Sequence, residues 1–139
     1  MIERDISRVQ SIVLPVLRDA LDDVKCGSWI EDVDHRTYPL INVRRLGGPG
    51  LLASRGRIDF AVIELTAIHD AGLIECENLL MDARQVIFDM VDKQVVTEHG
   101  YLHSYFETMG PTQFDSPYED TWRVQALIQL GVRPPRTKE

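Results

Sequence analysis

The sequence predicts an α+β fold in which a single, mainly antiparallel sheet of about four to five strands packs against an N-terminal helix and one long helix. Apolar residues recur at three- and four-residue spacing over residues 3–22 and 71–93, as in helices that bury one face. Strand-like patterns occupy most of the rest, at residues 38–46, 57–68, 101–108 and 121–130. With 139 residues, 44% of them hydrophobic, the chain can bury one sizeable core. We therefore expect one domain that spans residues 1–139.

The N-terminal helix is predicted over residues 3–22, where Val9, Val13 and Leu17 share one face. Pro15 lies inside this stretch. An interior proline removes one helical hydrogen bond and crowds the preceding turn. We therefore expect a kink, or a break that divides the helix in two.

Two strands are predicted next, a short one at residues 29–30 and a longer one at 38–46. Pro39 cannot donate a hydrogen bond to a strand ladder, so it favours a strand end or an edge position. Residues 47–56 carry a cluster of glycines and follow the second strand. They are predicted to form a flexible loop, with the glycines at a hairpin tip.

The segment at residues 57–68 gives the strongest strand pattern, because apolar residues occupy both of its faces. Such a strand lies in the middle of a sheet that is covered on two sides. The helix at 71–93, with Asp70 as its N-cap, supplies one cover. The first helix is too short to cover all of the opposite face, so a neighbouring subunit could supply the remainder.

The contact between the long helix and the central strand can be assigned to particular residues. Ile87 on the helix and Val62 on the strand are predicted to be buried against one another's elements. The alternative is that Leu79 and Val86, on another side of the helix, face the core instead.

The C-terminal region is predicted to form two strands, at 101–108 and 121–130, joined by a long loop. On the final strand, Val124 and its alternate neighbours make an apolar face, and the other face is polar with few charges. A polar face of this kind suits contact with another protein. The loop at 109–120 is predicted to make an intermolecular contact, and residues 132–139 to form a mobile tail.

Composition excludes several classes of function. The formal charge of −7 and the pI near 5.0 argue against specific nucleic-acid binding, because phosphate contacts need clustered basic residues. The N-terminus has the wrong charge for a secretory signal, and no apolar run is long enough to span a bilayer. We expect a cytosolic chain without membrane contact. Cys26 and Cys76 are expected to be buried free thiols.

No catalytic, cofactor-binding or metal-binding residue is predicted, and we do not expect an enzyme. His99 and His103 have no further ligands at a recognisable spacing. Asp59 and Glu64 are weakly similar to the acidic pair of a metal-dependent nuclease, but the expected lysine is absent and the two point to opposite faces. The glycines at residues 47–50 lack the lysine and hydroxyl residue of a phosphate-binding loop.

Four segments carry a resemblance to a known family. They read IVLP, PLINVRRLGG, VIELTA and ETMGPTQFDSPYEDTWRVQ, at residues 12–15, 39–48, 62–67 and 107–125. Together they resemble the tail terminator proteins of long-tailed actinobacteriophages, over nearly the whole chain. Head–tail adaptor and stopper proteins have a similar size and remain an alternative, with a small metal-dependent nuclease as a more distant one.

The resemblance implies a structural virion protein with an α+β fold. Its copies would form a hexameric ring at the head-proximal end of the tail, stop polymerisation of the tail tube and join the tail to the head connector. The partners implied are further copies of this chain, the major tail tube protein and the connector or stopper protein, with DNA passing through the ring. Assembly would take place in the cytoplasm of the bacterial host.

Seven residues are candidates for contacts between subunits. Four are apolar or aromatic side chains in the two predicted loops, and three are arginines that could meet acidic neighbours across a boundary. They are Leu51, Leu52, Phe114, Tyr118, Arg44, Arg45 and Arg123.

Overall fold

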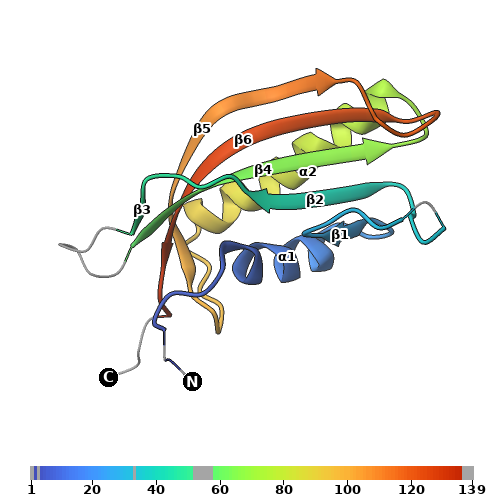
Figure 1. The fold of residues 1–139 in the computed structure, drawn as a ribbon. Helices are drawn as coiled ribbons and strands as arrows, with labels where there is room; N and C mark the ends of the chain where they lie inside the picture. Colours follow the sequence, from blue (N-terminus) through green and yellow to red (C-terminus); the bar gives the residue numbers. More distant parts are fainter. Residues whose placement is uncertain (1, 3, 33, 52–57, 136–139) are drawn as a thin grey trace.

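A computed structural model gives the fold of the chain (Figure 1) and describes residues 2, 4–32, 34–51 and 58–135. In chain order the elements are α1 (Val9–Ala20), β1 (Lys25–Gly27), β2 (Leu40–Arg45), β3 (Gly50–Leu51), β4 (Asp59–His69), α2 (Leu73–Asp92), β5 (Tyr101–Phe114) and β6 (Trp122–Arg133). The strands form one sheet in the order β1-β2-β4-β6-β5, with β3 paired to β4. Only the β1–β2 pair is parallel among the described strands. The α+β prediction is confirmed, with slightly more strands than expected.

Both helices lie on the same face of the curved sheet (Figure 1). The buried core is one cluster in which α1 contributes Ile12 and Leu17, α2 contributes Leu80 and Ile87, and the sheet contributes residues such as Ile63. The expectation that the first helix lies on the opposite face is therefore wrong. Since α1 packs beside α2, no described helix covers the second face of the sheet.

β4 is the central strand, as predicted, between β2 and β6. Ile63 pairs with Ile128 of β6, and both are fully buried beneath the helices. Ile87 of α2 is also fully buried, but Val62 lies half-buried on the opposite face. The predicted contact of Val62 with the long helix is wrong, because successive strand residues point to opposite sides.

α1 begins at Val9 rather than near residue 3, and it remains one helix through Pro15. Arg8 has an extended backbone, with ψ of 139°, so the helix does not extend back toward the N-terminus. Ile6 still packs against the core from outside the helix. Ile6 therefore fits the apolar spacing of the helix although it lies outside the helix.

The short strand predicted at residues 29–30 is wrong, and β1 lies just before it. Cys26 in β1 is buried, whereas Trp29 is 73% exposed, so Trp29 is not a core anchor. Pro39 lies directly before β2, which confirms the predicted strand end. Its carbonyl accepts a hydrogen bond from the amide of Lys25 at 3.1 Å and so joins the start of β2 to β1.

The glycine segment after β2 runs alongside β4 and does not project as a free hairpin tip. Val62 donates its amide to the carbonyl of Gly47 at 3.1 Å, and β3 pairs with the start of β4. Gly48 has φ of +109°, and a side chain there would clash with the carbonyl of Phe60. The strand pairing thus continues into the predicted loop. Residues 52–57, which include the rest of the predicted loop, lie outside the described residues.

α2 presents its predicted apolar side to the sheet, including Cys76, Leu80 and Ile87, and Leu79 is buried beside them. Its N-cap is Gly72 and not Asp70, and no side chain caps the helix. The first turn is instead closed by a hydrogen bond from the Cys76 amide to the Gly72 carbonyl, at 3.0 Å.

β5 forms one edge of the described sheet and is longer than predicted, because it continues to Phe114. Its pairing with β6 shifts register at three places, between Leu102 and Ser104, Glu107 and Met109, and Met109 and Thr112. Residues 109–114 are therefore strand and not loop. Bulges allow the strand to pass Gly110 and Pro111, which break the alternating pattern in the sequence.

β6 also extends past its predicted end. Val132, expected to start a mobile tail, is fully buried in the core and pairs with Leu102 of β5. The last four residues of the expected tail, 136–139, lie outside the described residues.

Candidate interaction surfaces

The sheet has one face without helices, which we call the helix-free face. Residues paired directly across strands point to the same side, so the strand register defines this face. It comprises Leu40, Asn42 and Arg44 of β2, Phe60, Val62, Glu64, Thr66 and Ile68 of β4, Arg123, Gln125, Leu127 and Gln129 of β6, and Phe106, Met109, Thr112 and Phe114 of β5. The polar second face predicted for β6 belongs to it.

A buried polar row crosses the middle of the helix-free face. Asn42, Thr66 and Gln125 are paired in register across three strands and are 7%, 3% and 8% exposed. The Thr66 hydroxyl donates to Oε1 of Gln125 at 3.3 Å. Oδ1 of Asn42 is buried and has no hydrogen-bond partner among the described residues. A buried acceptor without a partner is unfavourable, so this row is incomplete in the isolated chain.

A pocket of about 210 Å³ opens over this row. Its rim includes Tyr118, whose ring lies 3.7 Å from the guanidinium carbon of Arg36. Arg123 lines the pocket and has its guanidinium carbon 5.3 Å from the ring centre of Phe114. Its buried Nε finds no hydrogen-bond partner in the part of the chain that the structure describes. Three of the predicted contact residues, Arg44, Tyr118 and Arg123, thus line one pocket, and Phe114 lies beside Arg123. Tyr118 and Phe114 already have contacts within their own chain.

The two predicted arginines of β2 have different surroundings, because neighbouring strand residues point to opposite faces. Arg44 is exposed on the helix-free face and reaches Oε2 of Glu64 at 3.3 Å. Arg45 donates two hydrogen bonds to the carboxylate of Asp59, at 2.7 and 2.9 Å. These bonds raise the pKa of Arg45 above its ordinary value. Arg45 is therefore engaged within its own chain, and Arg44 is the more available for a partner.

The remaining sequence candidates are more scattered. Leu51 is 60% exposed at the end of β3, and Leu52 lies outside the described residues. Asp59 and Glu64 are each paired with an arginine, on opposite faces of β4. Within the described ranges, no three histidine, cysteine or acidic side chains gather as a metal site.

Both cysteines are buried free thiols, as predicted. Sγ of Cys76 lies 3.3 Å from the carbonyl oxygens of both Ala67 and Trp122 and can donate its one proton to either. Burial raises the pKa of the Cys76 thiol to about 11, and it also raises the pKa of Cys26. Neither thiol is a reactive nucleophile at neutral pH.

Sequence reasoning missed an apolar stripe on the outer side of α2. Ile74, Met81 and Phe88 are 70%, 50% and 44% exposed and recur every seven residues. This spacing places them above one another on one side of a helix, away from the buried side. The seven-residue recurrence was available in the sequence, but the stronger core pattern obscured it. The helix is also acidic, with five carboxylates and one arginine.

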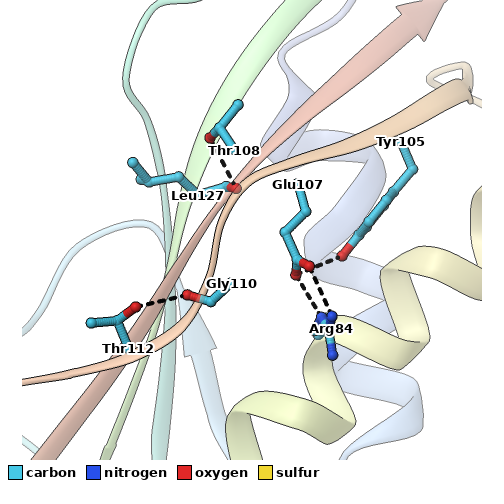
Figure 2. Close-up of polar contacts among 7 residues, drawn as sticks. All are labelled: Arg84, Tyr105, Glu107, Thr108, Gly110, Thr112 and Leu127. Atoms are coloured by element: carbon cyan, nitrogen blue, oxygen red, sulfur yellow. Dashed lines mark hydrogen bonds and ion pairs between the residues drawn. The ribbon is translucent and has the colours of Figure 1, made fainter.

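Next to this stripe, α2 is joined to β5 by an ion pair (Figure 2). Arg84 of α2 holds the carboxylate of Glu107 through two hydrogen bonds, at 2.6 and 2.8 Å, and Tyr105 also contacts that carboxylate. The hydrogen bonds that Arg84 donates to Glu107 raise the pKa of Arg84. At the adjacent bulges, the Thr108 hydroxyl donates to the Leu127 carbonyl and the Thr112 hydroxyl to the Gly110 carbonyl. The irregular edge strand is thus anchored on both sides.

No helix in the described part of the chain is long and apolar enough to cross a bilayer.

Comparison with known proteins gives matches over nearly the whole chain. A family model described as phage tail termination protein matches residues 5–139. Two proteins, each named Gene 22 protein, from Mycobacterium phage D29 and Mycobacterium phage L5, are each 47% identical over 132 residues, which is 94% of this chain and 95% of theirs. One solved structure, the virion of a native gene transfer agent particle, aligns with 90% of this chain and 87% of its own at 15% identity and a TM-score of 0.46.

Proposed function

The chain belongs to the phage tail termination protein family, and from this premise we propose that it forms a hexameric ring at the head-proximal end of the phage tail. The observation that carries the proposal is the family match over residues 5–139, almost the full length. As a structural tail protein, the chain acts through surfaces and not through a reaction. Its proposed partners are further copies of itself, the tail tube protein and the connector or stopper protein.

In this proposal, termination follows from a change of surface. A tube grows while its end offers the surface that the next ring of tube protein binds. A ring of a different protein covers that end and offers another surface instead, so growth stops and the head connector can bind. A heterologous contact repeated around an axis closes such a ring when the rotation between neighbours fits a whole turn.

The proposed contact residues follow from the geometry above. Arg44 and Arg123 supply positive charge on the helix-free face, and Phe114 and Tyr118 supply aromatic surface beside the pocket. Leu51 adds an exposed apolar side chain at the opposite end of the sheet, with Leu52 next to it in the sequence. Arg45 contributes by holding the start of β4 through Asp59.

The proposal is tested by removing the chain from a phage whose tail contains it. We expect tails of irregular, excessive length and heads without tails, as seen by electron microscopy of the lysate. Supplying the chain from a plasmid should restore tails of one length. A cryo-electron-microscopy reconstruction of the neck should place a sixfold ring of this chain between the tube and the connector.

The same experiment separates the proposal from the adaptor or stopper alternative. Loss of an adaptor or stopper leaves tails of normal length that fail to join heads. Normal tail lengths in the absence of this chain would therefore overturn the terminator assignment. A ring on the head side of the connector would do the same.

A further inference from the structure

We propose that the outer side of α2 in one copy covers the helix-free face of the next copy, so that each sheet in the ring is completed by its neighbour's helix. This inference rests on the proposed ring and names the surfaces that build it. It follows from two surfaces of one chain that are both uncovered and that match in apolar character, charge and length.

The first surface is the apolar half of the helix-free face. It is formed by Phe60 and Val62 of β4, Leu127 of β6, and Phe106 and Met109 of β5, with Leu46 beside them, since Leu46 follows β2 and donates its amide to the Val62 carbonyl. Gln129 lies between Val62 and Phe106. Phe106 is 64% exposed and Leu46 is 40% exposed. The helix-covered face buries such side chains under α1 and α2, but the described chain has no helix for this one. An uncovered surface this rich in apolar side chains marks a contact with another protein.

The second surface is the α2 stripe of Ile74, Met81 and Phe88. Large apolar side chains that stay exposed to water on a surface helix are unfavourable, and a partner that buries them is stabilising. The stripe holds a fixed position, because Phe88 packs edge-on against Tyr105 at 5.4 Å and Arg84 is fastened to Glu107. A fixed stripe loses little conformational entropy when it binds.

Charge distinguishes these two surfaces and favours their mutual contact. α2 carries five carboxylates and one arginine, so it repels a second α2. The helix-free face carries two arginines, Arg44 and Arg123, and one carboxylate, Glu64. A carboxylate of the neighbouring helix can instead pair with the exposed guanidinium of Arg44. Helix against sheet is therefore favoured over helix against helix.

The dimensions also agree. The 20 residues of α2 make a helix about 30 Å long, and the 11 residues of β4 make a strand about 36 Å long. Since the two surfaces lie on different sides of the chain, their contact is heterologous. Every pair of copies therefore keeps one α2 stripe and one helix-free face unoccupied. Such a contact continues from copy to copy until the ring closes.

Crosslinking in assembled tails tests the inference. The variant Met81→Cys/Leu127→Cys places one thiol on each surface, and a short bismaleimide should then join copies into a ladder that reaches the hexamer. Met81→Cys alone and Leu127→Cys alone should give no crosslinked dimer, because each surface meets the other kind. The unchanged chain is a control for its own thiols, which are both buried. The variant Met81→Cys/Asp34→Cys is the matched control, since Asp34 is exposed in the segment between β1 and β2.

A charge exchange gives a second readout. Arg44→Glu should lower ring formation by about tenfold or more, and Asp82→Arg in the same chain should restore much of the loss. Circular dichroism checks that each variant is folded.

The outcomes separate this inference from the function it rests on. A sixfold ring without the crosslinked ladder overturns the inference and leaves the proposed function standing. A dimer from Met81→Cys alone means that two α2 helices meet, which also overturns it. Crosslinks from Leu127→Cys to tube or connector protein assign the helix-free face to another partner. If the tails contain no ring of this chain, the proposed function fails, and the inference fails with it.

Discussion

Ile63 and Val62 are neighbours in β4, yet the chain surrounds them differently. Ile63 is fully buried beneath two helices, and Val62 is half-buried on a face that no described helix covers. The same contrast holds for Arg45 and Arg44 in β2, of which the first is clamped by Asp59 and the second is exposed. The helix-covered face is completed within the chain, so its side chains determine stability. The helix-free face is incomplete, so its side chains should matter more for assembly.

The largest effect is expected on the helix-covered face. Ile87→Ala should lower the free energy of unfolding by about 2–5 kcal/mol, because it removes buried methyl groups and leaves a cavity. Val62→Ala on the other face should cost the isolated chain less than about 1 kcal/mol. Urea unfolding followed by circular dichroism measures both. Equal costs would mean that the two faces are equally buried in the isolated chain.

The buried thiol of Cys76 gives the next effect, as a dependence on pH. Its pKa of about 11 lies above the ordinary value of 9.0, because burial disfavours the thiolate. The stabilisation is therefore complete below pH 9 and is lost as the pH rises toward 11, by at most roughly 2.7 kcal/mol. Unfolding measured at pH 8 and pH 10.5 should show a larger loss in the unchanged chain than in Cys76→Ala. An identical loss in both would exclude this thiol as the cause.

The ion pairs Arg45–Asp59 and Arg44–Glu64 allow the two faces to be compared through smaller energies. A double-mutant cycle with Arg45→Met and Asp59→Asn should give a coupling of about 1 kcal/mol, because the pair is bidentate and partly buried. The same cycle with Arg44→Met and Glu64→Gln should give less than about 0.5 kcal/mol, as for exposed pairs. Thermal unfolding at low and high salt provides the measurement. A stronger coupling for Arg44 would contradict the assignment of that residue to assembly.

A small effect on stability is also expected beside the pocket. Tyr118→Ala removes the stacking with Arg36 and should cost about 0.5–1 kcal/mol. Combined with Phe114→Ala, it should leave the chain folded but reduce the joining of heads and tails, if the segment at 109–120 makes the predicted intermolecular contact. Particle counts and infectivity are compared with those of Thr108→Ala, a change in the same hairpin. Wild-type infectivity of the double variant would make this segment a passive connection.

Sequence reasoning predicted the elements whose pattern is long and regular. β4, α2 and β6 were found because alternation or helical spacing continues over many residues, and the α2 core side was assigned correctly at Cys76, Leu80 and Ile87. β1 and β3 were missed because three and two residues are too short to show a period. The end of β5 was missed because bulges around Gly110 and Pro111 interrupt the alternation.

The arrangement of surfaces was harder to predict than the elements. Both faces of β4 are apolar in the sequence, and that pattern does not say which face the helices occupy. Here α1 precedes the first strand and α2 lies in the connection from β4 to β5, and both helices pack on one side of the sheet. The pocket residues Asn42 and Arg123 come from distant strands, so only the strand register brings them together. The variants above test four of the predicted contact residues, Arg44, Arg45, Phe114 and Tyr118.

The irregular pairing of β5 has a consequence for the time before the tail is built. A straight edge strand with all its amides free would recruit the same strand from other copies, and a chain produced in quantity would aggregate into sheets. β5 instead changes register three times, and Pro111 offers no amide at all. Copies that wait for a tail should therefore stay dispersed. Replacing Pro111 with threonine should make the purified chain precipitate at lower concentration, as light scattering would record.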